Sequence, residues 1–164
     1  MRVYLPTTVD GLAAAYEAGA FATPPLDAHA VTPAIREWYV SGDLEELEYA
    51  ALTDAAEASL RLLAAAGKAS FRRVVVAADV PDTAVRPRHD DLFRSAVTVL
   101  SAVPLEDVAS VHVDEPEAAD VVAAAARALP AADDGDDDAR FALDEAEATE
   151  LLWYDVTEIP DLLP

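Results

Sequence analysis

The run LEELEYAALTDAAEASLRLLAAAGKASFRRVVVAADV, residues 44–80, decides the fold. Apolar side chains recur in its first part every three or four residues, as on one face of a helix, at Leu44, Leu47, Ala51, Ala55, Ala58 and Leu62. Gly67 is a typical C-terminal stop for such a helix. The β-branched triplet at 74–76 is typical of a buried strand. The sequence therefore predicts a helix over Leu44–Ala66 and a strand over Arg73–Val80.

The residues before this run predict one strand and two helices, over Val3–Leu5, Val9–Ala18 and Pro33–Val40. Gly19 is expected to close the first of these helices. Thr32 and Pro33 suit the start of the second, because threonine is a good N-cap and proline fits the first helical turn. Residues 20–31 contain two adjacent prolines and are predicted to form a loop.

The residues after the run predict three more strands and one helix, with strands over Val97–Val103, Ser110–Val113 and Leu151–Ile159 and a helix over Glu115–Leu129. Residues 82–95 are polar and are expected to form a loop. Pro130 should end the last helix, because proline cannot continue the hydrogen-bond pattern. Five aspartates then predict a mobile acidic loop over 131–139.

The predicted order is strand, helices, three strands, helix and strand. It indicates an α+β protein in which helices pack on one face of a sheet. A two-layer sandwich with a ferredoxin-like split βαβ arrangement and additional helices fits this order best. A three-layer α/β sheet is the alternative. The length of 164 residues favours a single α+β domain over 1–164.

Charge and composition exclude several classes of partner. The net charge is −21, and phosphate backbones and anionic membrane surfaces repel such a protein. The chain has no cysteine, so a disulfide framework is excluded. We therefore expect a cytoplasmic protein that binds neither nucleic acid nor membranes. No cofactor is predicted.

Two residues at a predicted strand end could serve a metal. His112 and Asp114 are two positions apart, so their side chains would share one face of a strand. Imidazole and carboxylate are ligands that divalent metals accept, and Asp79 ends a strand that could lie nearby. The alternative is that Asp114 caps the helix that follows. This alternative is favoured, so no metal site is predicted.

The segment around the second helix could form a binding patch. His29 precedes that helix, which carries Arg36, Trp38 and Tyr39. The planar guanidinium of Arg36 could hold a carboxylate or a phosphate. The alternative is structural: the two aromatic side chains anchor a short helix to the core, and Arg36 pairs with an acid.

Basic residues are concentrated in one part of the chain. Six of the eleven lie within 27 residues, at Lys68, Arg72, Arg73, Arg86, Arg88 and Arg94. This segment could bind an anionic ligand or the aspartates near 133–138 of the same or another chain. The alternative is a solvated loop whose arginines pair locally.

The last predicted strand has large side chains on both faces, with Trp153 on one and Tyr154 on the other. Such a strand is covered on both sides or contributes to an interface. Homodimerisation through this strand is one of the two outcomes that the pattern allows.

Four segments of the chain carry a resemblance: His29–Tyr39, Arg73–Asp82, Val111–Pro116 and Glu150–Glu158. They resemble a family of small uncharacterised proteins from high-GC Gram-positive bacteria, a domain of unknown function. The resemblance covers nearly the whole chain and so implies one domain, in the cytoplasm. It implies no activity and no site residue.

Two hypotheses of function follow. The first is a non-enzymatic binding or interaction module, homodimeric, because no nucleophile or acid–base set is evident. The second is a small enzyme or ligand- or metal-binding protein with a pocket near His29, Arg36, Asp79 and His112. The second requires these four side chains to converge on one cleft.

Overall fold

The computed structural model describes residues 1–67 and 70–164 and consists of short strands and six α-helices within those ranges. The strands are β1 Arg2–Thr7, β2 Ala20–Phe21, β3 Leu26–His29, β4 Val74–Asp79, β5 Val85–Pro87, β6 Ala96–Val99, β7 Val103–Pro104, β8 Val108–Val113 and β9 Leu152–Tyr154. The helices are α1 Val9–Ala18, α2 Pro33–Trp38, α3 Leu44–Ala66, α4 Ala119–Asp133, α5 Asp137–Glu147 and α6 Ile159–Leu162. Single 3₁₀ turns occupy Asp82–Ala84, Leu105–Asp107, Pro116–Ala118 and Val156–Glu158. The expected α+β class is confirmed.

Seven strands form one sheet in the order β5-β6-β3-β1-β4-β8-β9, and every neighbouring pair described is antiparallel. Strands β2 and β7 pair separately. Because β3 and β4 are both antiparallel to β1 and lie on either side of it, they are parallel to each other. Helix α3 connects them, which makes β3–α3–β4 a split βαβ unit. The sheet is larger than a ferredoxin-like one.

Helices cover both faces of this sheet. Along β1, Val3 and Leu5 point to one face, where they pack with α1 and α6. Tyr4 points to the other face, where it packs with Ala51 and Ala55 of α3. This layering differs from a sandwich with helices on one face. The valine-rich β4 requires cover on both sides, since Val74, Val75 and Val76 are all fully buried.

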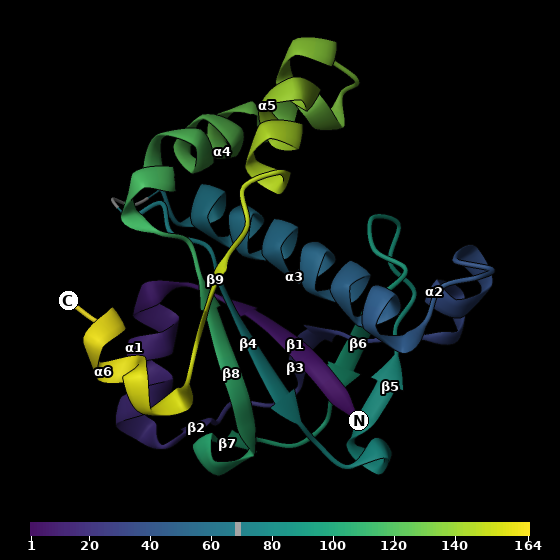
Figure 1. Cartoon of the computed structure of the whole chain (residues 1–164), viewed down its shortest axis with the longest axis vertical. Helices are drawn as coiled ribbons and strands as arrows, with labels where there is room; N and C mark the ends of the chain where they lie inside the picture. Colours follow the sequence, from purple (N-terminus) through teal and green to yellow (C-terminus); the bar gives the residue numbers. More distant parts are fainter. Residues whose placement is uncertain (68–69) are drawn as a thin grey trace.

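Helices α4 and α5 form an antiparallel pair that packs on α3, away from the sheet (Figure 1). The predicted loop over 131–139 is wrong, because α4 continues to Asp133 and α5 begins at Asp137. Pro130 lies inside α4 and does not end it. A proline so near the C-terminus of a helix removes one hydrogen bond, and packing of Leu129 and its neighbours against α3 and α5 holds the last turn in place.

Local signals placed α3 and α1 correctly, whereas α4 begins and ends four residues later than the predicted helix over Glu115–Leu129. Helix α3 has the predicted bounds, with the Asp43 carboxylate accepting from the N–H of Glu46 at its start. Helix α1 ends at Gly19, whose φ of 80° is in the left-handed region that glycine tolerates. Thr32 caps α2 as expected, although α2 ends at Trp38.

Strand predictions were less accurate. The segment 20–31 contains β2 and β3, and 82–95 contains β5, where loops were predicted. The last strand is limited to Leu152–Tyr154 and is followed by a 3₁₀ turn and α6. These strands are two to four residues long, so pairing with neighbours defines them more than their own pattern does.

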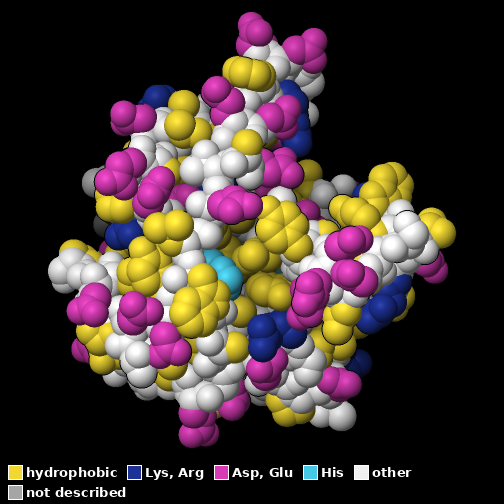
Figure 2. Space-filling model, viewed as in Figure 1, with side chains coloured by type: hydrophobic (Ala, Val, Ile, Leu, Met, Phe, Trp, Pro, Cys, Tyr) yellow, Lys and Arg dark blue, Asp and Glu magenta, His cyan; other side chains and the backbone are white. Residues whose placement is uncertain are grey.

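Acidic side chains are spread over the face seen in Figure 2, with arginines in a few separate places. Within the described residues, no helix is both long enough and apolar enough to span a membrane. The prediction that 1–164 is one domain stays a prediction.

Candidate functional site

A cavity opens where β1 and β3 separate. The two strands are paired at one position, Tyr4 with His29. Beyond it, the end of β1 (Leu5–Thr7) and the start of β3 (Leu26, Asp27) both line a cavity of about 640 Å³. A second cavity, of about 140 Å³, lies between α3 and α5. The larger one has room for a small organic molecule.

The walls of this β1–β3 cavity come from α1, the β2–β3 segment, α3 and residues 88–93. Most of the lining side chains are apolar: Leu5, Pro6, Ala14, Ala15, Ala18, Ala20, Phe21, Ala22, Pro25, Leu26, Ala58, Leu62 and Phe93. The polar ones are few: Thr7, Thr23, Asp27, His29, Arg61, Arg88 and Asp90. A mostly apolar wall with few polar groups is the usual composition of a small-molecule site.

His29 belongs to a hydrogen-bonded chain of three polar side chains, two of them buried and one half-buried. Its Nδ1 lies 2.8 Å from the hydroxyl oxygen of Ser95. That hydroxyl donates a hydrogen bond of 2.6 Å to Oδ2 of Asp54. His29 and Ser95 are 2% and 0% exposed, so their hydrogen bond is shielded from bulk water, whereas Asp54 is half-buried. We call these three residues the Asp54–Ser95–His29 chain.

Three elements bring the side chains of Asp54, Ser95 and His29 together. Strands β3 and β6 pair so that His29 is opposite Ala96, next to Ser95. The N–H of Ala30 donates to the carbonyl of Ser95 at 2.9 Å, which fixes the backbone there. Helix α3 packs on the same sheet face and supplies Asp54.

Burial sets the charge states of His29 and Asp54, the two ends of the Asp54–Ser95–His29 chain. It lowers the pKa of His29 to about 4, with a further contribution from Arg88 that outweighs Asp90. The imidazole is therefore neutral at pH 7. Burial also raises the pKa of Asp54 to about 6. The carboxylates of Glu57 and Glu147 add to this rise, whereas the Ser95 hydrogen bond and Arg94 oppose it. Asp54 is thus mostly ionised at pH 7.

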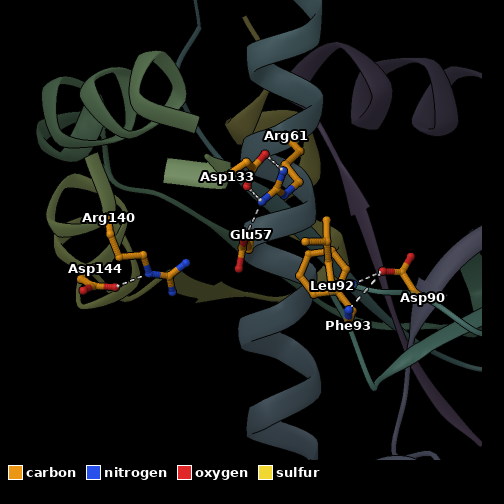
Figure 3. Close-up of polar contacts among 8 residues, drawn as sticks. All are labelled: Glu57, Arg61, Asp90, Leu92, Phe93, Asp133, Arg140 and Asp144. Atoms are coloured by element: carbon orange, nitrogen blue, oxygen red, sulfur yellow. Dashed lines mark hydrogen bonds and ion pairs between the residues drawn. The ribbon is translucent and has the colours of Figure 1, made fainter. Parts of the chain in front are cut away.

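Acids neutralise both arginines of the cavity. Arg61 donates to both carboxylate oxygens of Asp133 at 3.0 Å and to Glu57 at 3.0 Å (Figure 3). Arg88 donates to Asp90 at 2.8 Å and lies 3.8 Å from Asp27. Each guanidinium therefore faces two carboxylates, and the cavity has no surplus positive charge to attract an anion.

Asp90 also organises the cavity wall through the backbone. Its Oδ1 accepts hydrogen bonds from the N–H groups of Leu92 and Phe93, at 2.8 and 3.1 Å (Figure 3). The turn places the Phe93 ring nearly perpendicular to that of His29, with 5.1 Å between ring centroids. The imidazole therefore contacts both the Phe93 ring and the Ser95 hydroxyl.

The second nitrogen of His29 is the polar atom that the ring can offer to the cavity. Nε2 has no hydrogen-bond partner among the described residues, and it is not fully buried, unlike the unpartnered Nε atoms of Arg61 and Arg88. A neutral imidazole nitrogen of this kind can hydrogen-bond a ligand or exchange a proton with it.

The structure gives Asp114 a different role from the predicted helix cap. It is fully buried, and its carboxylate accepts from the backbone N–H of Arg73 at 2.9 Å and from the Arg73 guanidinium at 2.8 Å on each oxygen. The 3₁₀ turn that precedes α4, Pro116–Ala118, has Glu115 as its N-cap residue and no side-chain cap. The capping prediction is therefore wrong, because the buried arginine requires this carboxylate as its counter-ion.

Asp79 and His112 do not line the β1–β3 cavity, and Arg2 acts on both of them. Asp79 pairs with Arg2, at 2.8 Å, and this pairing lowers the pKa of Asp79. His112 is half-buried on the face of β8 with its Nε2 2.9 Å from the Ser110 hydroxyl, and burial together with Arg2 lowers the pKa of His112. His29 is therefore the predicted pocket residue that lines the β1–β3 cavity.

Trp38, the last residue of α2, and Tyr39, which follows it, are exposed. Trp38 is 61% and Tyr39 is 44% exposed, so they do not anchor α2 to the core. Ile35 does so instead. The guanidinium of Arg94 stacks on the Trp38 ring at 3.7 Å. Arg36 is exposed on the same helix, away from the cavity lining.

The basic segment is divided among several local contacts. Arg73 is buried against Asp114, and Arg72 donates to the Asp114 carbonyl at 2.9 Å. Arg86 is exposed on β5. Lys68 lies outside the described residues. The aspartate segment does meet an arginine, but it is Arg61 of α3, which was not predicted.

Sequence reasoning missed Asp54 and Ser95. Asp54 is not one of the apolar positions that predict α3, and Ser95 is the last residue of the predicted loop over 82–95. They are 41 residues apart, and Ser95 is 66 residues from His29. The one sequence signal was an acid on α3 close to positions that pack on the sheet, Ala51 and Ala55.

The fold and site define an α+β protein built on a seven-stranded antiparallel sheet, with an internal histidine at a largely apolar cavity. The model of a family of unknown function, DUF6912, matches residues 1–163, and the chain belongs to this family. The predicted resemblance to such a family is confirmed; an origin in high-GC Gram-positive bacteria stays a prediction. Nothing among curated proteins or solved structures matches the chain.

Proposed function

We propose that this protein is a binding module for a small, largely apolar, uncharged ligand held in the β1–β3 cavity. The observation that carries the proposal is the cavity of about 640 Å³ whose lining is mostly apolar. Both lining arginines are already neutralised, which favours an uncharged ligand over an anion. His29, neutral at pH 7, is the polar anchor.

Binding is favoured over catalysis by the order of the three polar groups. In a hydrolase with a serine nucleophile, the hydrogen-bonded order is aspartate, histidine, serine. The serine lies at the end of this series, and the histidine takes its proton. Here Ser95 lies in the middle, fully buried, and donates to Asp54. Its hydroxyl is therefore hydrogen-bonded to both His29 and Asp54 and cannot reach a substrate.

The experiment uses two aromatic probes, 2-naphthol and 2-methoxynaphthalene, with calorimetric titration of the whole chain. Leucine in place of Ala14, an exposed alanine of α1 that lines the cavity, should weaken binding of any probe at least tenfold by occupying the space. Ala131→Leu is the matched control, because Ala131 is also exposed on a helix but lies on α4, outside the lining. If neither probe binds, or Ala14→Leu binds as tightly as the unaltered protein, the proposal is wrong.

A second candidate function is an interaction module that forms homodimers in the cytoplasm. Strand β9 is an edge of the sheet, and its Leu152 and Trp153 are 42% and 61% exposed. An exposed apolar edge strand can pair with a second copy. The net charge of −21 opposes such pairing and keeps the protein soluble, so dimerisation should strengthen with salt. Light scattering that shows only monomers at high salt and high protein concentration would exclude the dimer.

A further inference from the structure

We infer that Asp54 and Ser95 hold His29 in the tautomer protonated on Nδ1, so that the bare Nε2 selects ligands that donate a hydrogen bond. This inference rests on the proposed function and deepens it, since it names the chemical class of the ligand: an apolar molecule carrying a hydroxyl or an N–H group. It makes Asp54 and Ser95 positioning residues, which do not touch the ligand.

The tautomer of His29 follows from counting the protons in the Asp54–Ser95–His29 chain. An ionised carboxylate can only accept, so the single hydroxyl proton of Ser95 points to Asp54, 2.6 Å away. The Ser95 oxygen then has only lone pairs to offer to Nδ1 of His29, 2.8 Å away. A hydrogen bond at that distance requires the proton on Nδ1. A neutral imidazole has one N–H, so Nε2 is an acceptor.

A bare Nε2 discriminates strongly between ligands. A ligand with a hydroxyl or N–H placed at His29 satisfies the acceptor. One that lacks the donor leaves a buried acceptor unpaired, and a site built for a donor rejects such an analogue. Among the described residues, neither lining arginine donates to His29: Arg61 donates to Asp133 and Glu57, and Nη1 of Arg88 donates to Asp90.

Protonation of Asp54 should reverse this selection. A protonated carboxyl can donate to the Ser95 oxygen, which frees the Ser95 proton for Nδ1 and moves the histidine proton to Nε2. The groups that act on Asp54 are Ser95, Glu57, Glu147 and Arg94. Arg88 and Asp90 are those that act on His29, which stays neutral while Asp54 titrates near pH 6. Donor ligands are therefore preferred at pH 8 and acceptor ligands at pH 5.

The tautomer can be measured without any ligand, by long-range ¹H–¹⁵N correlation NMR on histidine-labelled protein at pH 8. His29 should show a protonated Nδ1 and a bare Nε2, with its signals assigned from a His29→Gln variant. In Asp54→Ala the Ser95 hydroxyl has only Nδ1 left to donate to, so the proton should move to Nε2. Glu48→Ala is the matched control, since Glu48 also lies on α3 and accepts from a hydroxyl, that of Tyr4 at 3.4 Å. His29 should keep its tautomer in that variant.

The same proteins test whether the site prefers ligands that donate a hydrogen bond. At pH 8, 2-naphthol, which donates, should bind at least tenfold more tightly than 2-methoxynaphthalene, which has the same rings and no donor. In Asp54→Ala the ratio should fall below threefold. A proton on Nε2 in the unaltered protein, an unchanged tautomer in Asp54→Ala, or equal binding of the two probes would overturn the inference while leaving the cavity a binding site. Failure of both probes to bind overturns the proposed function instead, and the ligand class falls with it.

Discussion

Two arginine–aspartate pairs in this protein have the same geometry, but one pair is buried and the other is exposed. This difference predicts how much each pair contributes to the free energy of unfolding. In each pair, Nε and Nη2 of the arginine contact the two carboxylate oxygens. The distances are both 2.8 Å for Arg73 with Asp114, and 2.8 and 3.0 Å for Arg2 with Asp79. The side chains of the first pair are 4% and 0% exposed, and those of the second are 36% and 60% exposed.

We expect Asp114→Asn to lower the free energy of unfolding by about 3–5 kcal/mol, because it leaves a guanidinium buried without its counter-ion. Arg73 also donates to the carbonyl of Thr149 at 2.9 Å, so its displacement would loosen the segment that leads to β9. Asp79→Asn should cost only about 0–1 kcal/mol, since water already solvates that pair.

Urea unfolding followed by circular dichroism at pH 7 measures both changes, provided that the slope against urea concentration is the same in all variants. The Asp79→Asn loss should shrink in added salt, whereas the Asp114→Asn loss should not. Replacing both buried partners, as Arg73→Met with Asp114→Leu, should recover much of the loss. Equal losses for the two single variants would refute the reasoning that burial, rather than geometry, sets the value of the pair.

Three further changes test other parts of the structure. Pro130→Ala should stabilise the protein by about 1–3 kcal/mol in urea unfolding, because proline lies inside α4; a loss of stability would show that the proline is needed for the turn into α5. The pKa of His29 is about 4 in the folded protein against an ordinary 6.5, so the unfolded chain takes up the proton first. Stability present above pH 6.5 should therefore fall toward pH 4, by on the order of 3 kcal/mol. Thermal melts of His29→Gln should show a flatter profile, and an unchanged one would contradict the burial argument. Asp54 acts with the opposite sign: its pKa rises from 3.8 to about 6 on folding, so its contribution falls as pH rises through that window. Asp54→Asn should remove this fall, and melts in which the fall persists would assign it to other groups.

Short-range information in the sequence was sufficient for the helices that carry their own signals. Helix α3 was predicted with its observed bounds, because 23 residues of regular apolar spacing end at a glycine. Helix α5 was missed for the opposite reason. It is strongly acidic, it buries only Leu143 and Ala146, and it depends on packing against α4 and α3. An acidic segment with few apolar residues resembles a loop until a neighbouring helix covers those few.

The site was only partly predictable. His29 was named as a candidate, but its partners were not, because hydrogen bonds to Ser95 and Asp54 join residues distant in sequence. Asp114 illustrates the same difficulty. An aspartate before a helix has a sufficient local explanation as a cap, and only the buried position of Arg73 shows that it serves as a counter-ion.

The sequence by itself determined the α+β class, the acidic surface, the extent of α3 and the extended valine run of β4. These properties depend on periodicity, composition and residues within a few positions of one another. The tertiary structure alone decided the order of the strands, the cover on both sheet faces, the cavity and the Asp54–Ser95–His29 chain. Those features depend on contacts between segments that are distant in sequence. Such contacts lower the free energy only once both segments are folded and bury each other's surfaces.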